Sequence, residues 1–188
     1  MQFIHLTGLS AVFFASIVSA QSPAISQSEG TVFVQDKPLL QPATLPDGSV
    51  VRTAEASRVE IRLRGGVLHV GANSSVRILE NRPYNFNRFE VLSGSVVLST
   101  DRDGSASAVC ENAIQFSESG VYRFDRKDDC RFRVYQGAAS VQLPSLPVVL
   151  TSGGTMNLNR GCGDMVPHDH FNTQEIDNLD RWSRERRQ

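Results

Sequence analysis

Residues 57–76, SRVEIRLRGGVLHVGANSSV, decide the fold. Apolar residues alternate with charged ones from Arg58 to Arg64, which is the period-two pattern of a strand with one buried face. The Gly65-Gly66 pair that follows suits the positive φ angles of a two-residue hairpin turn. Pairing Arg64 with Val67 would place the apolar side chains of both arms on one face. The expected partners are Leu63 with Leu68, Ile61 with Val70, and Val59 with Ala72.

The same pairing of apolar residues across a glycine-containing turn predicts two more hairpins, one turning at Ser93-Gly94 and one at Gln136-Gly137. The first would pair Val91 with Val96 and Phe89 with Leu98, and the second Val134 with Ala139 and Phe132 with Val141. Further strands are expected at residues 31–35, 49–53, 76–79, 147–150 and 155–158, with a meander formed by 110–116, 121–125 and 130–135. The fold class is therefore expected to be all-β, a compact sandwich or roll of short, mostly antiparallel strands.

One short α-helix is predicted at the C-terminus. Asn172 and Glu175 have the spacing of a capping box, and Phe171 and Ile176 could form the hydrophobic staple around it. The stripe expected to face the β-body comprises Ile176, Leu179 and Trp182. Acidic residues begin this helix and arginines end it, which complements the helix dipole. Because the helix is short, we expect it to persist only when docked.

Length and composition place the chain among ordinary globular proteins. Its 188 residues suit one domain, with 40% hydrophobic and 21% charged residues. The formal net charge of −1 provides no basic field for nucleic acid, so no nucleic-acid partner is expected.

The N-terminus resembles a secretory signal. Residues 6–18 form an apolar core that is too short to span a bilayer as a helix, and Val18-Ser19-Ala20 supplies small residues before Gln21. We therefore expect export to the periplasm or the exterior, with no stable membrane insertion after cleavage. The expected organisation is a signal peptide (1–20), a linker (21–30), a β domain (31–160), and a loop with the C-terminal helix (161–188).

The three cysteines suggest one disulfide. Cys110 and Cys130 fall on the apolar side of their predicted strands, and an oxidising compartment favours a bridge. In the predicted meander one strand separates them, which would hold them about 9–10 Å apart, too far for a bridge unless the strand ends converge. The alternative is two buried thiols.

A metal site is a second possibility, near the C-terminus. Cys162, His168 and His170 lie within nine residues, together with Asp164 and Asp169. Thiolate and imidazole groups could bind a transition metal. Their spacing matches no standard metal motif, and the competing interpretation is a loop that leads to the helix.

Three segments carry a resemblance to a known family. They are Asp47-Gly48-Ser49 with Thr53-Ala54 and residues 57–63, then VGANSSVR at residues 70–77, then FEVLSGSV at residues 89–96. This pattern, which extends over roughly residues 31–158, resembles the FecR domain family. The resemblance implies an extracytoplasmic β-rich module, best known in transmembrane regulators that relay a receptor signal to a sigma factor. Those regulators carry a cytoplasmic anti-sigma segment and a membrane span before the module, and we expect neither in these 188 residues.

Function is harder to predict because no nucleophile elbow, Walker loop or HExxH spacing occurs, and no cofactor is expected. The leading hypothesis is an exported, non-enzymatic module of the cell envelope that binds, senses or scaffolds an envelope protein or a glycan. Arginines and aromatics carry much interface energy, so we select such residues, with one histidine, as candidate binding residues. They are Arg62, Arg64 and His69 on the central hairpin, and Tyr84, Phe86 and Arg88 in the loop at 81–88.

Two alternatives stay open. One is a small extracytoplasmic hydrolase that acts on a polysaccharide or a peptide, for which a pair of carboxylates would be needed. Glu60, Glu90 and Glu111 are the strand glutamates considered for it, although each is expected to be solvated. The other alternative is a metal-binding envelope protein that uses the cluster from Cys162 to His170.

Overall fold

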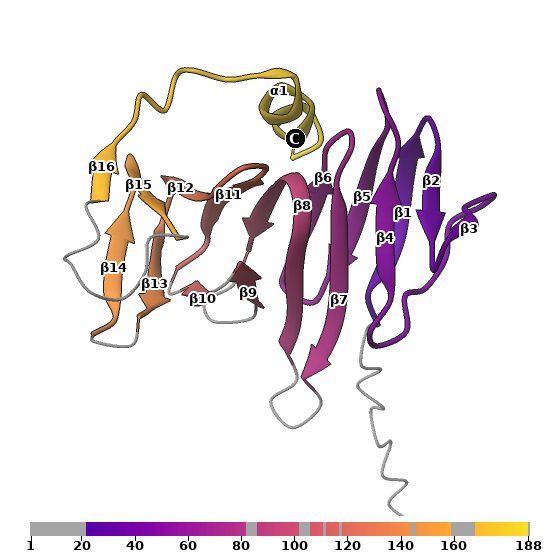
Figure 1. Cartoon of the computed structure of the whole chain (residues 1–188), viewed down its shortest axis with the longest axis horizontal. Coiled ribbons are helices and arrows are strands. Elements are labelled where there is room, and N and C mark those ends of the chain that lie inside the picture. The colour runs from indigo at the N-terminus through magenta and orange to yellow at the C-terminus, as the bar shows by residue number, and fades with distance from the viewer. Residues whose placement is uncertain are drawn as a thin grey trace, which may run out of the picture.

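The computed structural model describes residues 22–81, 86–101, 106–110, 112–116, 118–143, 146–158 and 168–187. The expected signal peptide lies outside these residues. Within them the chain forms sixteen strands and one helix (Figure 1). They are β1 (Ala24–Glu29), β2 (Val32–Val34), β3 (Lys37–Pro38), β4 (Val50–Thr53), β5 (Arg58–Leu63), β6 (Gly66–Val70), β7 (Ser75–Asn81), β8 (Phe86–Thr100), β9 (Ala106–Cys110), β10 (Asn112–Phe116), β11 (Gly120–Arg126), β12 (Cys130–Gln136), β13 (Ala138–Gln142), β14 (Val148–Thr151), β15 (Gly154–Asn157), β16 (His168–His170) and α1 (Asn178–Glu185).

The strands form two sheets that share β8. Sheet A has the order β1-β5-β6-β8-β11-β12-β15-β16. Sheet B has the order β3-β2-β4-β7-β8-β9-β10-β13-β14. The pairing of β8 with β9 is parallel and the others are antiparallel. The predicted fold class, all-β with one short C-terminal helix, is confirmed.

The central hairpin forms, but its predicted register is wrong by two residues. Leu63 pairs with Gly66, Ile61 with Leu68 and Val59 with Val70, so the turn lies at Arg64-Gly65. Gly66 pairs with Leu63 and with Thr100 of β8, and this position requires glycine because a Cβ there would lie 2.5 Å from the carbonyl oxygen of Ser99. An even shift keeps each side chain on its face. The predicted apolar face is therefore buried as expected, with Val59, Ile61, Leu63, Leu68 and Val70 all in the core.

The predicted hairpin at Ser93-Gly94 is wrong, because β8 runs through it as one strand. Residues 86–93 pair with β7 in sheet B, and residues 94–100 pair with β6 and β11 in sheet A. Gly94 has a φ of +83°, and a Cβ on it would lie 2.2 Å from the hydroxyl of Ser74. Glycine therefore permits the corner at which the chain passes between sheets. A hairpin and a corner would both bury the alternating apolar residues, including Val91 and Val96, so the alternation is compatible with either.

Gln136-Gly137 is a second corner of the same kind, and the hairpin predicted there is also wrong. Gly137 has a φ of +89°, and it separates β12 in sheet A from β13 in sheet B. Phe132 pairs with Phe124 and Met156 instead of Val141. The predicted meander is also wrong, because its first strand, β10, pairs with β9 and β13 in sheet B instead of with β11.

The predicted linker at 21–30 is wrong for Ala24–Glu29, which form the edge strand β1 beside β5. Within this strand Ile25 is the buried apolar residue, and the others are polar or small. An edge strand needs few apolar residues, so its sequence carried no strand pattern.

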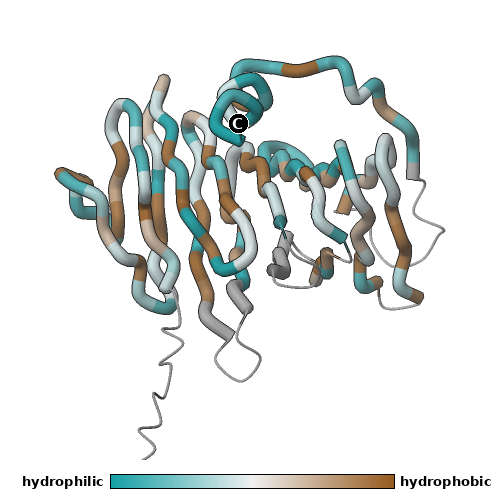
Figure 2. The backbone as a smooth tube through the Cα atoms, turned by 180° about the vertical axis from the view of Figure 1, so that it is seen from behind, coloured by the Kyte–Doolittle hydropathy of each residue, from teal (hydrophilic) through white to brown (hydrophobic). Residues whose placement is uncertain are grey.

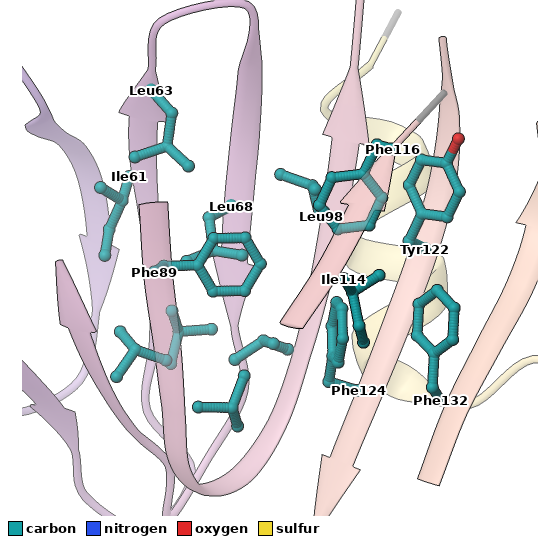
Figure 3. Close-up of a cluster of buried hydrophobic side chains, with 14 of the residues drawn as sticks. Ile61, Leu63, Leu68, Phe89, Leu98, Ile114, Phe116, Tyr122, Phe124 and Phe132 are labelled. Atoms are coloured by element: carbon teal, nitrogen blue, oxygen red, sulfur yellow. The ribbon is translucent and has the colours of Figure 1, made fainter. Parts of the chain in front are cut away.

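The inner faces of both sheets meet in one apolar core. Figure 3 shows Ile61, Leu68, Phe124 and Phe132 of sheet A clustered with Phe89 and Ile114 of sheet B. The ring centroids of Phe124 and Phe132 lie 4.9 Å apart. Figure 2 shows the matching alternation of hydrophobic and hydrophilic residues along the strands. Packed side chains fill this interior, which leaves the outer surfaces for a functional site.

Candidate functional site

Helix α1 covers part of the outer face of sheet A. After β16 the chain crosses along the top of the view in Figure 1 to α1, which lies above the ends of β6 and β8. Leu179 and Trp182 are buried there with Val97, Val121 and the partly buried Tyr135. Docking of Leu179 and Trp182 on the β-body is therefore confirmed. Ile176, the third residue of the predicted stripe, precedes the helix and is half-buried.

The helix begins later than predicted, because Asp177 is its N-cap. The Asp177 carboxylate accepts hydrogen bonds from the backbone N–H groups of Leu179 (2.9 Å) and Asp180 (3.0 Å). In return the Asp180 carboxylate accepts from the backbone of Asp177 at 3.2 Å, which completes a capping box built from two aspartates. The predicted cap, Asn172, instead accepts from the backbone of Gln174 and closes a turn before the helix.

Arg123 of β11 binds the cap of this helix to the sheet. Its side chain is 7% exposed and forms ion pairs with Asp125 (2.9 Å), Asp177 (2.7 Å) and Asp180 (2.6 Å). The hydroxyl of Tyr135 donates a further hydrogen bond to Asp180. Burial opposes ionisation of Asp177, but the bonds from Arg123 and from the helix backbone outweigh it and lower its pKa to about 2. Burial also disfavours the Arg123 cation, and its bonds with Asp177 and Asp125 nevertheless raise its pKa.

A buried trio, Glu60, His69 and Ser183, lies under the same helix. His69 Nδ1 is 3.1 Å from the Ser183 hydroxyl, and His69 Nε2 is 3.6 Å from Glu60 Oε2. His69 and Ser183 are 0% exposed and Glu60 is 5% exposed. Two predictions are therefore wrong: His69 is no exposed binding residue, and Glu60 is not solvated, because α1 covers this part of the hairpin's outer face. Burial lowers the pKa of His69 to about 4, against the opposing influence of Glu60.

This trio has the residue types of a hydrolytic triad but not an accessible nucleophile. A catalytic serine must present its hydroxyl oxygen to a substrate carbonyl while it hydrogen-bonds the histidine. The Ser183 hydroxyl is enclosed between the helix that carries it and the His69 ring. Movement of α1 away from the sheet would also carry Ser183 away from His69. The trio therefore fastens the helix to the sheet.

Trp182 is the main apolar anchor of α1. The guanidinium carbons of Arg58 and Arg186 lie 5.2 Å and 4.8 Å from its ring centroid, and the His69 ring meets it edge-on at 5.1 Å. Its indole N–H donates to Glu29 at 2.9 Å. Glu29 also pairs with Arg58 (2.9 Å) and Arg186 (2.7 Å). The Trp182 hydrogen bond, then the Arg186 hydrogen bond and both arginine charges, lower the pKa of Glu29 despite its partial burial.

A groove of about 860 Å³ runs beside the helix, between α1 and the rim of sheet A. Small residues, Ala56, Gly71, Ala72 and Ser95, form part of its lining. The charged lining residues are Arg58, Arg123, Lys127, Arg181 and Arg186 as cations, with Glu29, Asp177 and Glu185 as carboxylates. A Cβ on Gly71 would lie 3.0 Å from Leu179 Cδ2, so the missing side chain allows α1 to approach the sheet closely.

The charges of this groove suit binding better than acid–base catalysis. Hydrolysis of a glycoside needs one carboxylic acid whose pKa is raised enough to keep a proton. Here the pKa values of Glu29 and Asp177 are both lowered. The Ser95 hydroxyl in the lining donates to Asp125 at 2.7 Å instead of facing a histidine. The lining therefore presents fixed, ionised groups.

The predicted binding residues do not share one surface. Arg62 is exposed on β5 of sheet A, with its Nε 3.6 Å from Glu60, and Arg64 lies in the hairpin turn. Arg88 is half-buried on the sheet B part of β8, between Leu79 of β7 and Ser107 of β9. Tyr84 and the side chain of Phe86 lie outside the described residues. Sequence reasoning missed the groove, whose walls come from strands and a helix far apart in the chain.

Cys110 and Cys130 lie in different sheets. Cys110 ends β9 in sheet B, and Cys130 is buried at the start of β12 in sheet A. The predicted meander, in which one strand would have separated the two residues, does not form. It therefore gives no argument against a disulfide between them. The side chain of Cys110 lies outside the described residues, so its bridge with Cys130 stays a prediction.

The proposed metal ligands are described only in part. His168 and His170 are the ends of β16, whereas Cys162 and the side chain of His168 lie outside the described residues. Among the side chains that the structure describes, no three His, Cys, Asp or Glu residues are grouped to hold a metal ion. Within the same residues, no helix has the length and apolar character needed to cross a membrane.

Comparison with known proteins shows the fold. No family model and no curated protein matches this sequence. Two crystal structures, at 2.50 Å and 1.65 Å, are similar, and both carry a provisional description as an anti-sigma factor from Parabacteroides distasonis ATCC 8503. They superpose with TM-scores of 0.56 and 0.55 at 14% and 13% identity, over 66% of this chain and 61% of theirs. At this identity the likeness shows that the chain shares their β-fold.

Proposed function

We propose that this protein is an exported, non-enzymatic module of the cell envelope, FecR-like in fold, which binds a partner in the groove beside α1. The observation that carries this proposal is the groove itself, about 860 Å³ in volume and lined by ionised side chains next to a well-fixed helix. The fold shared with proteins described as anti-sigma factors supports a sensing or regulatory role. The FecR-like sequence pattern supports the same class.

The hydrolase alternative has less support. Its serine, Ser183, is enclosed, and the groove carboxylates Glu29 and Asp177 have lowered pKa values where an acid catalyst needs a raised one. Arg123, which holds Asp177 and Asp180, is committed to the docking of α1. These groups give the groove a fixed pattern of charge, which favours recognition.

Site-specific photo-cross-linking in the native envelope tests the proposal. A photoreactive residue at Asn178, which is exposed and lines the groove, should give one discrete adduct. The same residue at Arg62, exposed on β5 but outside the groove lining, is the matched control and should not give that adduct. Equal adducts at both positions would contradict a groove-specific partner.

Export is tested separately by the intact mass of the protein recovered from the periplasm or the medium. We expect the mature chain to begin at Gln21. A recovered mass that retains residues 1–20 would contradict signal cleavage.

A further inference from the structure

We infer that the groove beside α1 takes an acidic peptide segment of its partner. This inference rests on the proposed function and adds the chemistry of the bound group. It follows from the balance of charges along the groove and from the way in which Trp182 is covered.

Cations exceed carboxylates in the groove lining, by five to three. Two of the three carboxylates are already paired, since Glu29 lies between Arg58 and Arg186, and Asp177 binds Arg123. The third, Glu185, is exposed at the end of α1. Arg123 also pairs with Asp125 and Asp180, but these two carboxylates do not line the groove. Among the lining carboxylates, only Glu185 forms no ion pair within the described residues.

Lys127 and Arg181 are the cations available to a ligand. Both are exposed and line the groove, Lys127 after β11 and Arg181 on α1. Within the described part of the chain neither forms an ion pair, and the guanidinium of Arg181 makes a long contact of 3.4 Å with Asn178. One exposed cation on each wall suits carboxylates spaced along an extended chain.

The position of Trp182 favours a peptide over a sugar. A glycan site commonly offers an open aromatic face on which a sugar ring can stack. Trp182 is 5% exposed, and the guanidinium groups of Arg58 and Arg186 lie over its ring. The small, exposed residues Ala56 and Ala72 in the lining leave room for an extended main chain.

Trp182 is the single tryptophan of the chain, so its fluorescence reports on the groove directly. The test titrates the full-length protein with a short peptide of alternating Glu and Ala, and with the same peptide in which Gln replaces Glu. We expect a saturable change in emission with the Glu peptide that weakens as salt is raised, and none with the Gln peptide.

Charge reversal locates the binding. The double variant Lys127→Glu/Arg181→Glu should weaken binding of the Glu peptide by about tenfold or more. Arg62→Glu/Arg64→Glu makes the same change in net charge outside the groove and should leave the affinity within about twofold. An unchanged thermal midpoint in each variant shows that folding is intact.

Three results would overturn the inference: equal binding of the Gln peptide, equal weakening by both double variants, or a response to a sulfated oligosaccharide without one to the Glu peptide. If the Glu peptide causes no change in Trp182 emission but the groove-specific adduct at Asn178 forms, the acidic ligand is rejected and the proposed function is not. Loss of the adduct as well would reject both.

Discussion

The guanidinium of Arg123 donates to the carboxylate of Asp180 across 2.6 Å, which joins the centre of sheet A to the first turn of α1. Both side chains are buried. Asp180 also closes the capping box with Asp177, so one pair of aspartates starts the helix and docks it. Formation of α1 and its docking are therefore coupled, because a helix of eight residues is not stable alone.

Arg123→Ala should release the helix. It leaves Asp125, Asp177 and Asp180 without their shared cation, and loss of one partner of a buried ion pair costs about 3–5 kcal/mol. We expect faster hydrogen exchange in residues 178–185 and a red shift of Trp182 emission. Arg133→Ala is the control, because this side chain is 24% exposed and 3.3 Å from Asp125. The same exchange rates in both variants would contradict the role of Arg123.

Trp182→Ala should destabilise the docked state by about 3 kcal/mol, since a large buried ring leaves a cavity. Trp182→Phe keeps most of the ring and removes the hydrogen bond to Glu29, so it should cost only about 1 kcal/mol. Urea denaturation followed by circular dichroism measures both. An unchanged midpoint for Trp182→Ala would mean that α1 contributes nothing to the stability of the body.

Acid should loosen α1 in two steps. The pKa of His69 is about 4 in the folded protein and 6.5 ordinarily, so between these values the unfolded chain binds a proton that the folded chain excludes. Stability from this group is complete above pH 6.5 and falls as pH decreases toward 4, by at most about 1.4 kcal/mol per pH unit. Asp177, with its pKa lowered from 3.8 to about 2, adds a loss below pH 3.8.

Denaturation midpoints across this pH range test the assignment. His69→Gln should flatten the dependence between pH 6.5 and 4 and leave the loss below pH 3.8 in place. A variant whose pH profile matches the wild type over the upper range would contradict the role of His69.

Gly71→Val should weaken docking through crowding alone. A Cβ at this position already lies 3.0 Å from Leu179 Cδ2 and 3.2 Å from the Ser95 carbonyl, and branching adds further overlap. Overpacking of this kind costs about 1–3 kcal/mol. Ala72→Val, at the exposed neighbouring position, should change stability by less than about 0.5 kcal/mol. Equal midpoints for the two variants would show that Leu179 is free to move aside.

The sequence predicted which side chains are buried better than it predicted which strands pair. Alternation placed Val91, Val96, Val134 and Ala139 in the core, and all four are there. It could not distinguish a hairpin from a corner at Gly94 or Gly137, because both put the same residues inside. That choice depends on partners distant in sequence, such as Ser74 against Gly94.

The candidate site was less accessible to sequence reasoning. In the sequence, the polar face with Arg58, Glu60 and His69 is typical of a solvated strand. The structure covers this face with α1, whose contacts there are polar as well as apolar. His69 and Ser183 are 114 residues apart, and no local spacing relates them. The amphipathic pattern did identify Leu179 and Trp182 as docking residues, since helical periodicity is a local property.

The central claim, that a partner binds in the groove beside α1, is tested most directly by the yield of the Asn178 photo-adduct in charge-reversed variants. Lys127→Glu/Arg181→Glu should lower this yield by about tenfold, whereas Arg62→Glu/Arg64→Glu on the central hairpin should leave it unchanged. A yield that falls in the hairpin variant and is unchanged in the groove variant would contradict binding in the groove. It would instead place the binding site on the outer face of the hairpin.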